Sequence, residues 1–295
     1  ARGRFGGLLS PPAMLFTWII PLQWTPERRP AEPALTVRIP LPGSTIINTE
    51  QEVVLNDRIR VGDQMTAVER FDAVSQEKQS RLGTGHFITT STDFFRTDAA
   101  GNAEEEPVGS ITNTLFRYDP AAPDERPEAA PQERSVASRP AIPSAPVTGG
   151  PSPAVGEALA KIELELTLNK VVKVPSATLD FIPLHYDPDY ARRQGHPNIF
   201  LNTMTLLAMA DRLVLEWAGQ DAFIRRHHIG MRYPLHAGDT MVATGRVTDV
   251  GPYTGPFSDE FDSQAVVAAE LCNQSGRLCC ACEVTVALRA SDLRS

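Results

Sequence analysis

The chain has 295 residues, a formal net charge of −8 and a hydrophobic content of 42%. This length is enough for two domains of ordinary size, each with its own core. The acidic balance argues against nucleic-acid binding, which needs a basic face. No apolar run reaches the roughly 18 residues of a membrane span. We therefore expect a soluble two-domain protein that binds neither nucleic acid nor membrane.

The cysteines lie close together near the end of the chain, at Cys272, Cys279, Cys280 and Cys282. A zinc site would need paired Cys-x-x-Cys or Cys/His spacings. These cysteines instead fall in a segment that has the pattern of a strand. We interpret them as reduced, buried or half-buried thiols of a cytoplasmic protein, and we expect no metal.

Residues 1–118 predict a helix followed by strands. Ser10, Pro11 and Pro12 precede an apolar stretch, and these residues suit the cap and first turn of a helix. Residues 26–42 are rich in proline and arginine and predict an irregular loop. Alternating and β-branched residues then predict strands over 46–55, 65–74, 86–96 and 108–118.

Residues 119–153 have a different composition, with nine prolines and almost no large apolar side chains. Such a segment cannot bury enough surface to offset the entropy lost on ordering. We interpret it as a disordered linker.

Residues 154–295 predict a second unit. A strand-like pattern covers 164–174, and Asp180 and His185 follow in a proline-containing turn. Residues 198–217 predict a helix that is apolar almost all round, and such a helix is buried. Four further strands, predicted over 223–232, 240–250, 261–271 and 277–288, close a sheet.

The two halves of the sequence repeat. Residues 61–74 align with 237–250 at an offset of 176, and six of the fourteen positions are identical. Both halves also share an order of helix, loop, strand, Gly-Asp turn and strands. This predicts a duplication in which each half is a helix wrapped by an antiparallel sheet. The first-half counterparts of Asp180 and His185 would fall at or before residue 1. The first domain is then truncated at its start or incomplete, and we expect one active site per chain, in the second domain.

The segment after residue 179 contains a distinctive set of residues: Asp180, Pro183, Leu184, His185, Asp187, Ala191 and Gly195. This pattern resembles the catalytic segment of MaoC-like (R)-specific enoyl-CoA hydratases and dehydratases. The resemblance covers most of 157–290, and it implies an α+β fold, the double hot-dog, with Asp180 and His185 as catalytic residues. Residues 1–118 look like the FAS1-type dehydratase companion domain of this family, which usually lacks the catalytic pair.

A narrower likeness points to the substrate. Residues 199–203 and 217–219 look like the actinobacterial heteromeric hydratases that act on steroid side-chain enoyl-CoA thioesters. The general hydratases carry a His-Gly pair where this chain has Asn202 and Thr203, and an Asn where it has Ile182. The likeness therefore implies a bulky or steroid-type acyl group.

Hydration of a 2-enoyl-CoA thioester adds water across the C2=C3 bond. We expect Asp180 to act as the principal base and His185 to complete proton delivery, since an imidazole can serve as acid or base near neutral pH; the sequence leaves open which group does which. Amides at the start of the buried helix suit the thioester oxyanion. The expected oxyanion or substrate-binding residues are Asn198, Asn202 and Thr203.

Two arginine pairs are candidates for binding the CoA phosphates, because guanidinium groups bind phosphate well. They are Arg192 with Arg193 and Arg225 with Arg226; the alternative interpretation is a set of solvated surface charges. We expect no cofactor, because the CoA thioester is the substrate, and we expect a homodimer.

Three other functions stay open on the sequence. One is a 3-hydroxyacyl-ACP dehydratase of lipid or polyketide synthesis, and another is an acyl-CoA thioesterase, since hot-dog folds also hydrolyse thioesters. The third is a non-catalytic acyl-binding partner.

Overall fold

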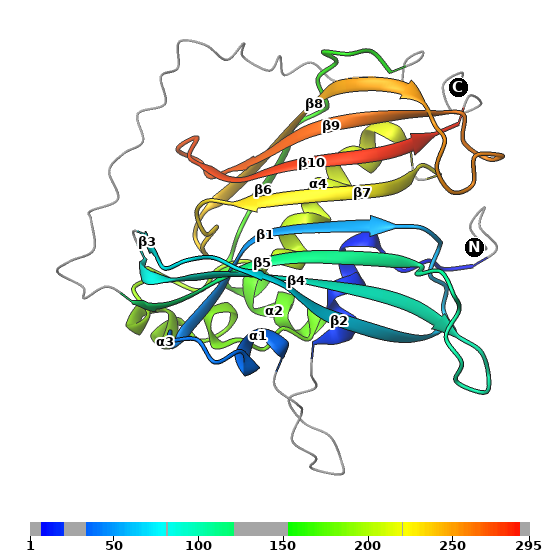
Figure 1. The fold of residues 1–295 in the computed structure, drawn as a ribbon. Coiled ribbons are helices and arrows are strands. Elements are labelled where there is room, and N and C mark those ends of the chain that lie inside the picture. Colours follow the sequence, from blue (N-terminus) through cyan, green and yellow to red (C-terminus); the bar gives the residue numbers. More distant parts are fainter. Residues whose placement is uncertain (1–6, 21–33, 81, 121–152, 220, 290–295) are drawn as a thin grey trace.

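Ten antiparallel strands form one curved sheet with the main helices behind it (Figure 1). The computed structural model describes residues 7–20, 34–80, 82–120, 153–219 and 221–289. The predicted linker, 119–153, lies almost entirely outside these residues. No described helix is both long and apolar enough to cross a membrane.

The first half contains two short helices and five strands. In chain order these are η1 (Pro12–Ile19), α1 (Leu35–Arg38), β1 (Thr45–Leu55), β2 (Gln64–Val74), β3 (Lys78–Ser80), β4 (Gly83–Thr97) and β5 (Gly109–Pro120). The first predicted helix is present, but it is a 3-10 helix. Within the stretch predicted as an irregular loop, α1 forms a single helical turn.

The second half contains the longest helix and five more strands. The elements are β6 (Ile162–Glu165), α2 (Leu168–Thr178), η2 (Pro183–His185), α3 (Pro188–Arg193), α4 (Thr203–Ala218), β7 (Phe223–Met231), β8 (Thr240–Pro252), β9 (Ser263–Cys272) and β10 (Leu278–Leu288).

The strand order confirms the predicted duplication. The sheet runs β2-β4-β5-β1 and then β7-β10-β9-β8-β6. Matching β1 with β7, β2 with β8, β4 with β9 and β5 with β10 shows the same order twice, in opposite directions from the junction. Gly62 and Gly238 precede equivalent strands, and both have a φ near 100°, which favours glycine. The fold is therefore the predicted α+β double hot-dog.

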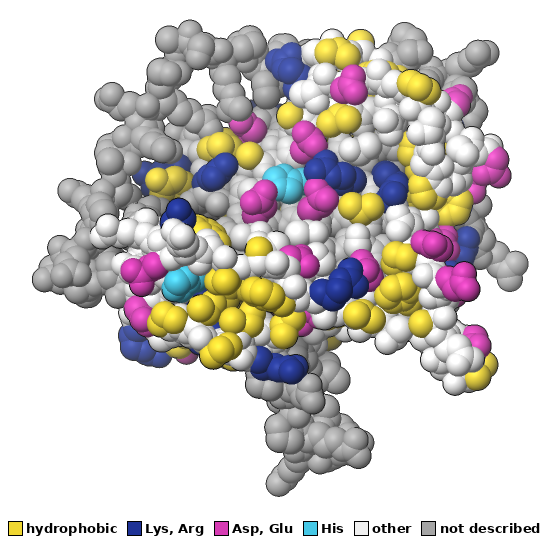
Figure 2. Space-filling view, in the orientation of Figure 1, with side chains coloured by type: hydrophobic (Ala, Val, Ile, Leu, Met, Phe, Trp, Pro, Cys, Tyr) yellow, Lys and Arg dark blue, Asp and Glu magenta, His cyan; other side chains and the backbone are white. Residues whose placement is uncertain are grey.

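The two halves meet where β1 pairs with β7. This antiparallel ladder runs from Glu50 opposite Gly230 to Val54 opposite Arg226. The outer face of the sheet carries charges of both signs over its middle (Figure 2). There Arg226 binds Glu52 of β1 and Glu283 of β10. The junction is thus held by backbone hydrogen bonds and by cross-strand ion pairs.

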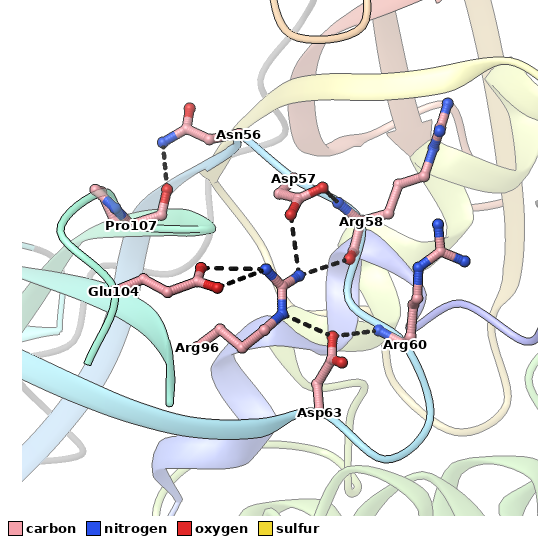
Figure 3. Close-up of polar contacts among 8 residues, drawn as sticks. All are labelled: Asn56, Asp57, Arg58, Arg60, Asp63, Arg96, Glu104 and Pro107. Atoms are coloured by element: carbon pink, nitrogen blue, oxygen red, sulfur yellow. Dashed lines mark hydrogen bonds and ion pairs between the residues drawn. The ribbon is translucent and has the colours of Figure 1, made fainter. Parts of the chain in front are cut away.

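A second contact between the halves involves Arg58, which follows β1. Its guanidinium donates two hydrogen bonds to Glu260, between β8 and β9, at 2.7 and 3.0 Å. Arg96 of β4 positions the loop that carries Arg58. It binds the carboxylates of Asp57, Asp63 and Glu104 and the carbonyl of Arg58 (Figure 3).

The helix α4 is buried on nearly all sides, as predicted. Its exposed residues are Ala208, Arg212 and Glu216, which are four residues apart and form one stripe. Each large apolar side chain that the other faces of α4 bury contributes roughly 1.5–3 kcal/mol to the free energy of folding. Gly245 of β8 lets the helix come close, because an added Cβ would lie 3.0 Å from Leu213.

Two predicted boundaries were wrong. The buried helix begins at Thr203, not at residue 198, because Asn202 is its N-cap and accepts a hydrogen bond from the amide of Thr205. The predicted strand over 164–174 is strand only to Glu165. Thr167 then caps α2, whose residues Val171 and Pro175 are buried at helical spacing.

Candidate active site

Asp180 and His185 face one another beside the start of α4. His185 Nε2 lies 3.5 Å from Asp180 Oδ2, and the two side chains are 9% and 13% exposed. The single 3-10 turn of η2 shortens the path between them. The structure thus brings together the two residues that the sequence singled out, in a position that solvent reaches only in part.

The tautomer of His185 follows from its second contact. Its Nδ1 lies 2.8 Å from the carbonyl oxygen of Phe200, which can only accept a hydrogen bond. Nδ1 therefore carries a proton, and in this tautomer the lone pair of Nε2 is directed toward Asp180. The two acceptors lie side by side, so one water molecule next to the pair can contact both.

Asp180 is held by Asn202, whose amide donates to Asp180 Oδ2 at 3.2 Å and to the hydroxyl of Thr178 at 2.7 Å. The Thr178 hydroxyl donates in turn to the carbonyl of Val174. Leu179 has a φ of 58°, so the chain reverses direction at the end of α2 and presents Asp180 to the helix start. The sequence did not single out Thr178, since a threonine near a helix end has no distinctive pattern.

The amides of Thr203 and Met204 have no hydrogen-bond partner within the part of the chain that the structure describes. They are the first amides of α4, where the helix dipole favours negative charge. The amides of Ile199, Phe200 and Leu201 already donate to Asn198 Oδ1 and to the carbonyls of Leu184 and Leu235. Of the predicted range of oxyanion amides, Thr203 and its neighbour Met204 are therefore available.

The side chains of Asn198 and Asn202 both make hydrogen bonds within the protein. The amide of Asn198 donates to the carbonyl of Ala237, so the side chain fixes the loop before α4. The side chain of Asn202 binds Asp180 and caps the helix. Neither side-chain amide is directed at a free oxyanion position in this structure.

The first half also reaches the site. Asn48 of β1 donates to the Thr203 hydroxyl at 3.0 Å, and Asn113 of β5 donates to Asn48 at 3.2 Å. These contacts join the start of α4 to the inner face of the first-half sheet. They connect residues 155 positions apart in the sequence, and a single sequence holds no signal of them.

The two arginine pairs lie in different surroundings. Arg192 forms an exposed ion pair with Asp189 on α3, and the guanidinium of Arg193 lies 5.8 Å from the centre of the Tyr190 ring. Arg225 donates to the carbonyl of Leu55, and Arg226 is bound by two carboxylates. The α3 pair is therefore the more accessible of the two.

An apolar rim surrounds the catalytic candidates. Phe181, Ile182 and Tyr186 are 38%, 49% and 41% exposed, which is high for large apolar side chains. A hollow of about 460 Å³ lies elsewhere, at the junction of β1 and β7, and its lining includes Glu50, His228 and Glu283. None of the residues described around Asp180 lines that hollow, and we assign it no part in the site.

Comparison with known proteins agrees with this arrangement. A family model described as "FAS1-like, dehydratase domain region" matches residues 1–103, which confirms the expectation for the first half. The 3-oxo-4,17-pregnadiene-20-carboxyl-CoA hydratase beta subunit of Mycobacterium tuberculosis is 35% identical over 96 residues. That match covers 32% of this chain and 74% of the subunit.

Solved structures share the fold over most of the chain. A MaoC-like dehydratase aligns with a TM-score of 0.67 and 17% identity, covering 97% of this chain and 86% of its own. The MaoC-like dehydratase of Phytophthora capsici aligns with a TM-score of 0.56 and 14% identity, covering 86% and 74%. Together with the mycobacterial relative, these findings place the chain in the MaoC-like hydratase and dehydratase family, as a hydro-lyase with a double hot-dog fold.

Proposed function

We propose that the chain catalyses the hydration of a 2-enoyl-CoA thioester and the reverse dehydration. Asp180 and His185 are the catalytic pair in this proposal. The observation that carries this proposal is the 3.5 Å approach of His185 Nε2 to Asp180 Oδ2 with Nδ1 anchored on the Phe200 carbonyl. The water oxygen attacks C3 and loses a proton to the pair. A proton is then delivered to C2, and the water has been added across the double bond.

The negative charge that develops on the thioester oxygen needs donors. We assign this role to the amides of Thr203 and Met204, which are unpaired in the described structure and lie at the positive end of α4. The donors are thus backbone amides at the start of the buried helix, one and two residues after the N-cap.

A bulky acyl group, of steroid type, is the substrate that we favour. The mycobacterial relative is by name a hydratase of a pregnadiene-carboxyl-CoA. The helix of the first half, η1, has 8 residues, whereas α4 has 16. The strand β2 is exposed along almost its whole length. Because few side chains cover this strand, we infer that the first half of the sheet leaves additional space for an acyl group.

The test is a hydration assay, by loss of enoyl absorbance, on CoA thioesters from crotonyl to steroid. We expect Asp180→Asn and His185→Ala each to lower kcat by about 10²–10⁴. Asp189→Asn and His228→Ala are matched controls, since Asp189 is 79% exposed and His228 lies on the outer face of the sheet. Unchanged turnover in either active-site variant would refute the assignment.

The same assay separates the alternatives. An ACP-linked dehydratase would turn over the ACP thioester in preference to the CoA thioester, and a thioesterase would release free thiol. A non-catalytic acyl-binding partner would bind the substrates without turning them over. The expected homodimer is tested by light scattering of the purified chain, where a monomer mass would refute it.

A further inference from the structure

A second Asp–His pair lies in the core, away from Asp180 and His185. Asp211 of α4 and His227 of β7 are 4% and 1% exposed, and His227 Nδ1 lies 2.8 Å from Asp211 Oδ1. A carboxylate oxygen accepts, so Nδ1 donates, and in this tautomer Nε2 is left with a lone pair. The proposed hydration chemistry makes no use of this pair.

Three buried acceptor atoms in this region have no hydrogen-bond partner among the described residues. They are His227 Nε2, Asp211 Oδ2 and Gln51 Oε1. Gln51 is fully buried, and its amide nitrogen donates to Asn113 Oδ1 at 3.4 Å. An unpaired buried polar atom destabilises the folded state, so native structures rarely leave one without water or a ligand.

The strand register places Gln51 and His227 on the same face. Gln51 of β1 lies opposite Ile229 of β7, and Val53 lies opposite His227. Residues two apart on a strand share a face, so Gln51 and His227 are diagonal neighbours, roughly 7–8 Å apart at the backbone. Asp211 packs on that face from α4, so all three acceptors lie between the helix and the β1–β7 junction.

We propose that Gln51, Asp211 and His227 form a buried site for one O–H donor, either a water molecule or a hydroxyl of the acyl group. The orphaned atoms are all acceptors, so the ligand must donate, and a hydroxyl donates without bringing charge into the core. A molecule held between two acceptors spans roughly 5–6 Å, which suits diagonal neighbours with long side chains.

The position of the site also indicates how far from the thioester an acyl hydroxyl would have to lie. Asp211 follows Thr203 by eight residues, which is about 12 Å along the helix axis. An acyl group whose thioester lies at the start of α4 would place a hydroxyl at this site if the hydroxyl were about that far from the thioester carbon. This source of the hydroxyl rests on the proposed function, whereas the water source does not.

Two measurements test the site. The first is a high-resolution crystal structure of the ligand-free protein. We expect density for a water within hydrogen-bond distance of Gln51 Oε1 and of His227 Nε2 or Asp211 Oδ2. Direct bonding among these side chains, with no water between them, would overturn the proposal, and this result does not depend on any variant or on turnover.

The second measurement compares kcat/KM for a 2-enoyl-CoA that carries a hydroxyl about 12 Å from the thioester with that for its deoxy analogue. If the acyl group supplies the hydroxyl, the wild type prefers the hydroxylated substrate roughly three- to tenfold. Gln51→Met abolishes this preference, and Gln79→Met, at an exposed position of β3, preserves it. If the bound molecule is only water, no preference is seen and the water persists in the complex with substrate.

The two proposals fail in distinguishable ways. No turnover of the deoxy substrate by the wild type would refute the hydratase function but leave the crystallographic water as a valid test. Normal turnover without a water in the crystal structure and without a preference would refute the buried site alone.

Discussion

The amide of Asn202 lies 3.2 Å from Asp180 Oδ2, the same carboxylate oxygen that faces His185. Asn202 also accepts a hydrogen bond from the Thr205 amide as the N-cap of α4. One side chain therefore fixes both the orientation of the proposed base and the start of the helix whose first amides are the proposed oxyanion donors. These two roles can be separated by the choice of substitution.

The variant Asn202→Ser keeps a capping hydroxyl but is too short to reach Asp180. We expect kcat to fall about tenfold or more, with a small change in the free energy of unfolding. Asn202→Ala removes the cap as well and should cost a further ~1 kcal/mol of stability. Kinetics and urea unfolding of both variants test this, with Asn198→Ala as the matched control. A normal kcat for Asn202→Ser would show that Asp180 needs no support.

The arginines of α3 are expected to bind the CoA phosphates. Arg192 is exposed, and its one ion pair among the described residues is with Asp189; such a pair has a small net strength and a phosphate can displace it. We expect Arg192→Ala with Arg193→Ala to raise KM for the CoA thioester several-fold and to leave kcat nearly unchanged. The same acyl group on pantetheine, which lacks the nucleotide phosphates, is the control substrate. An equal rise in KM for both thioesters would contradict the assignment.

The contact between Arg58 and Glu260 is expected to stabilise the junction of the halves. Arg58 is 7% exposed, and its guanidinium also lies 4.1 Å from the centre of the Phe257 ring. Hydrogen bonds from Arg58 lower the pKa of Glu260, so the carboxylate is charged near neutral pH. Glu260→Gln should lower the free energy of unfolding at pH 7 by about 2–3 kcal/mol, because Arg58 and Arg289 both lose an ionised partner.

The pH dependence of the free energy of unfolding tests whether the contribution of Glu260 is ionic. A carboxylate with a lowered pKa contributes stability above its unfolded value, and that contribution is lost as the pH falls through the folded value. The difference between wild type and Glu260→Gln in urea unfolding should therefore shrink between pH 6 and pH 3. A difference that is constant across this range would contradict the ionic origin.

The core cysteines are expected to be unreactive in the native state. Burial raises the pKa of Cys279 to about 12, and burial also raises the pKa values of Cys280 and Cys282. The thiolate is the reactive form, so iodoacetamide at pH 8 should leave these three thiols unmodified until urea unfolds the chain. Since the folded pKa values exceed the unfolded ones, stability should fall as the pH rises above about 8.5. Peptide mapping by mass spectrometry measures the alkylation at each cysteine.

The sequence was informative where the determinants are local. Asp180 and His185 are five residues apart, and the proline-containing turn between them is enough to bring them together. The Gly62 and Gly238 turns are likewise local, and they revealed the duplication. The apolar character of α4 predicted its burial, because nearly every face of the helix is hydrophobic.

The failures have equally physical causes. The sequence predicts that the buried helix begins at Asn198, but the chain bends there, and Asn202 is the residue that caps the helix. The apolar residues after Ile162 fit both alternation and helical spacing, and the tertiary structure puts Val171 on a helix. The contact of Asn48 with Thr203 depends on the pairing of β1 with β7, which a local pattern does not encode.

The antiparallel pairing of β1 with β7 joins two similar halves that one polypeptide supplies in a fixed ratio. Because both strands belong to the same chain, their association is intramolecular and does not weaken on dilution. The inner face of the first half contacts the start of α4 through Asn48. Substitutions on that face can therefore reshape substrate recognition while Asp180, His185 and Asn202 stay unchanged.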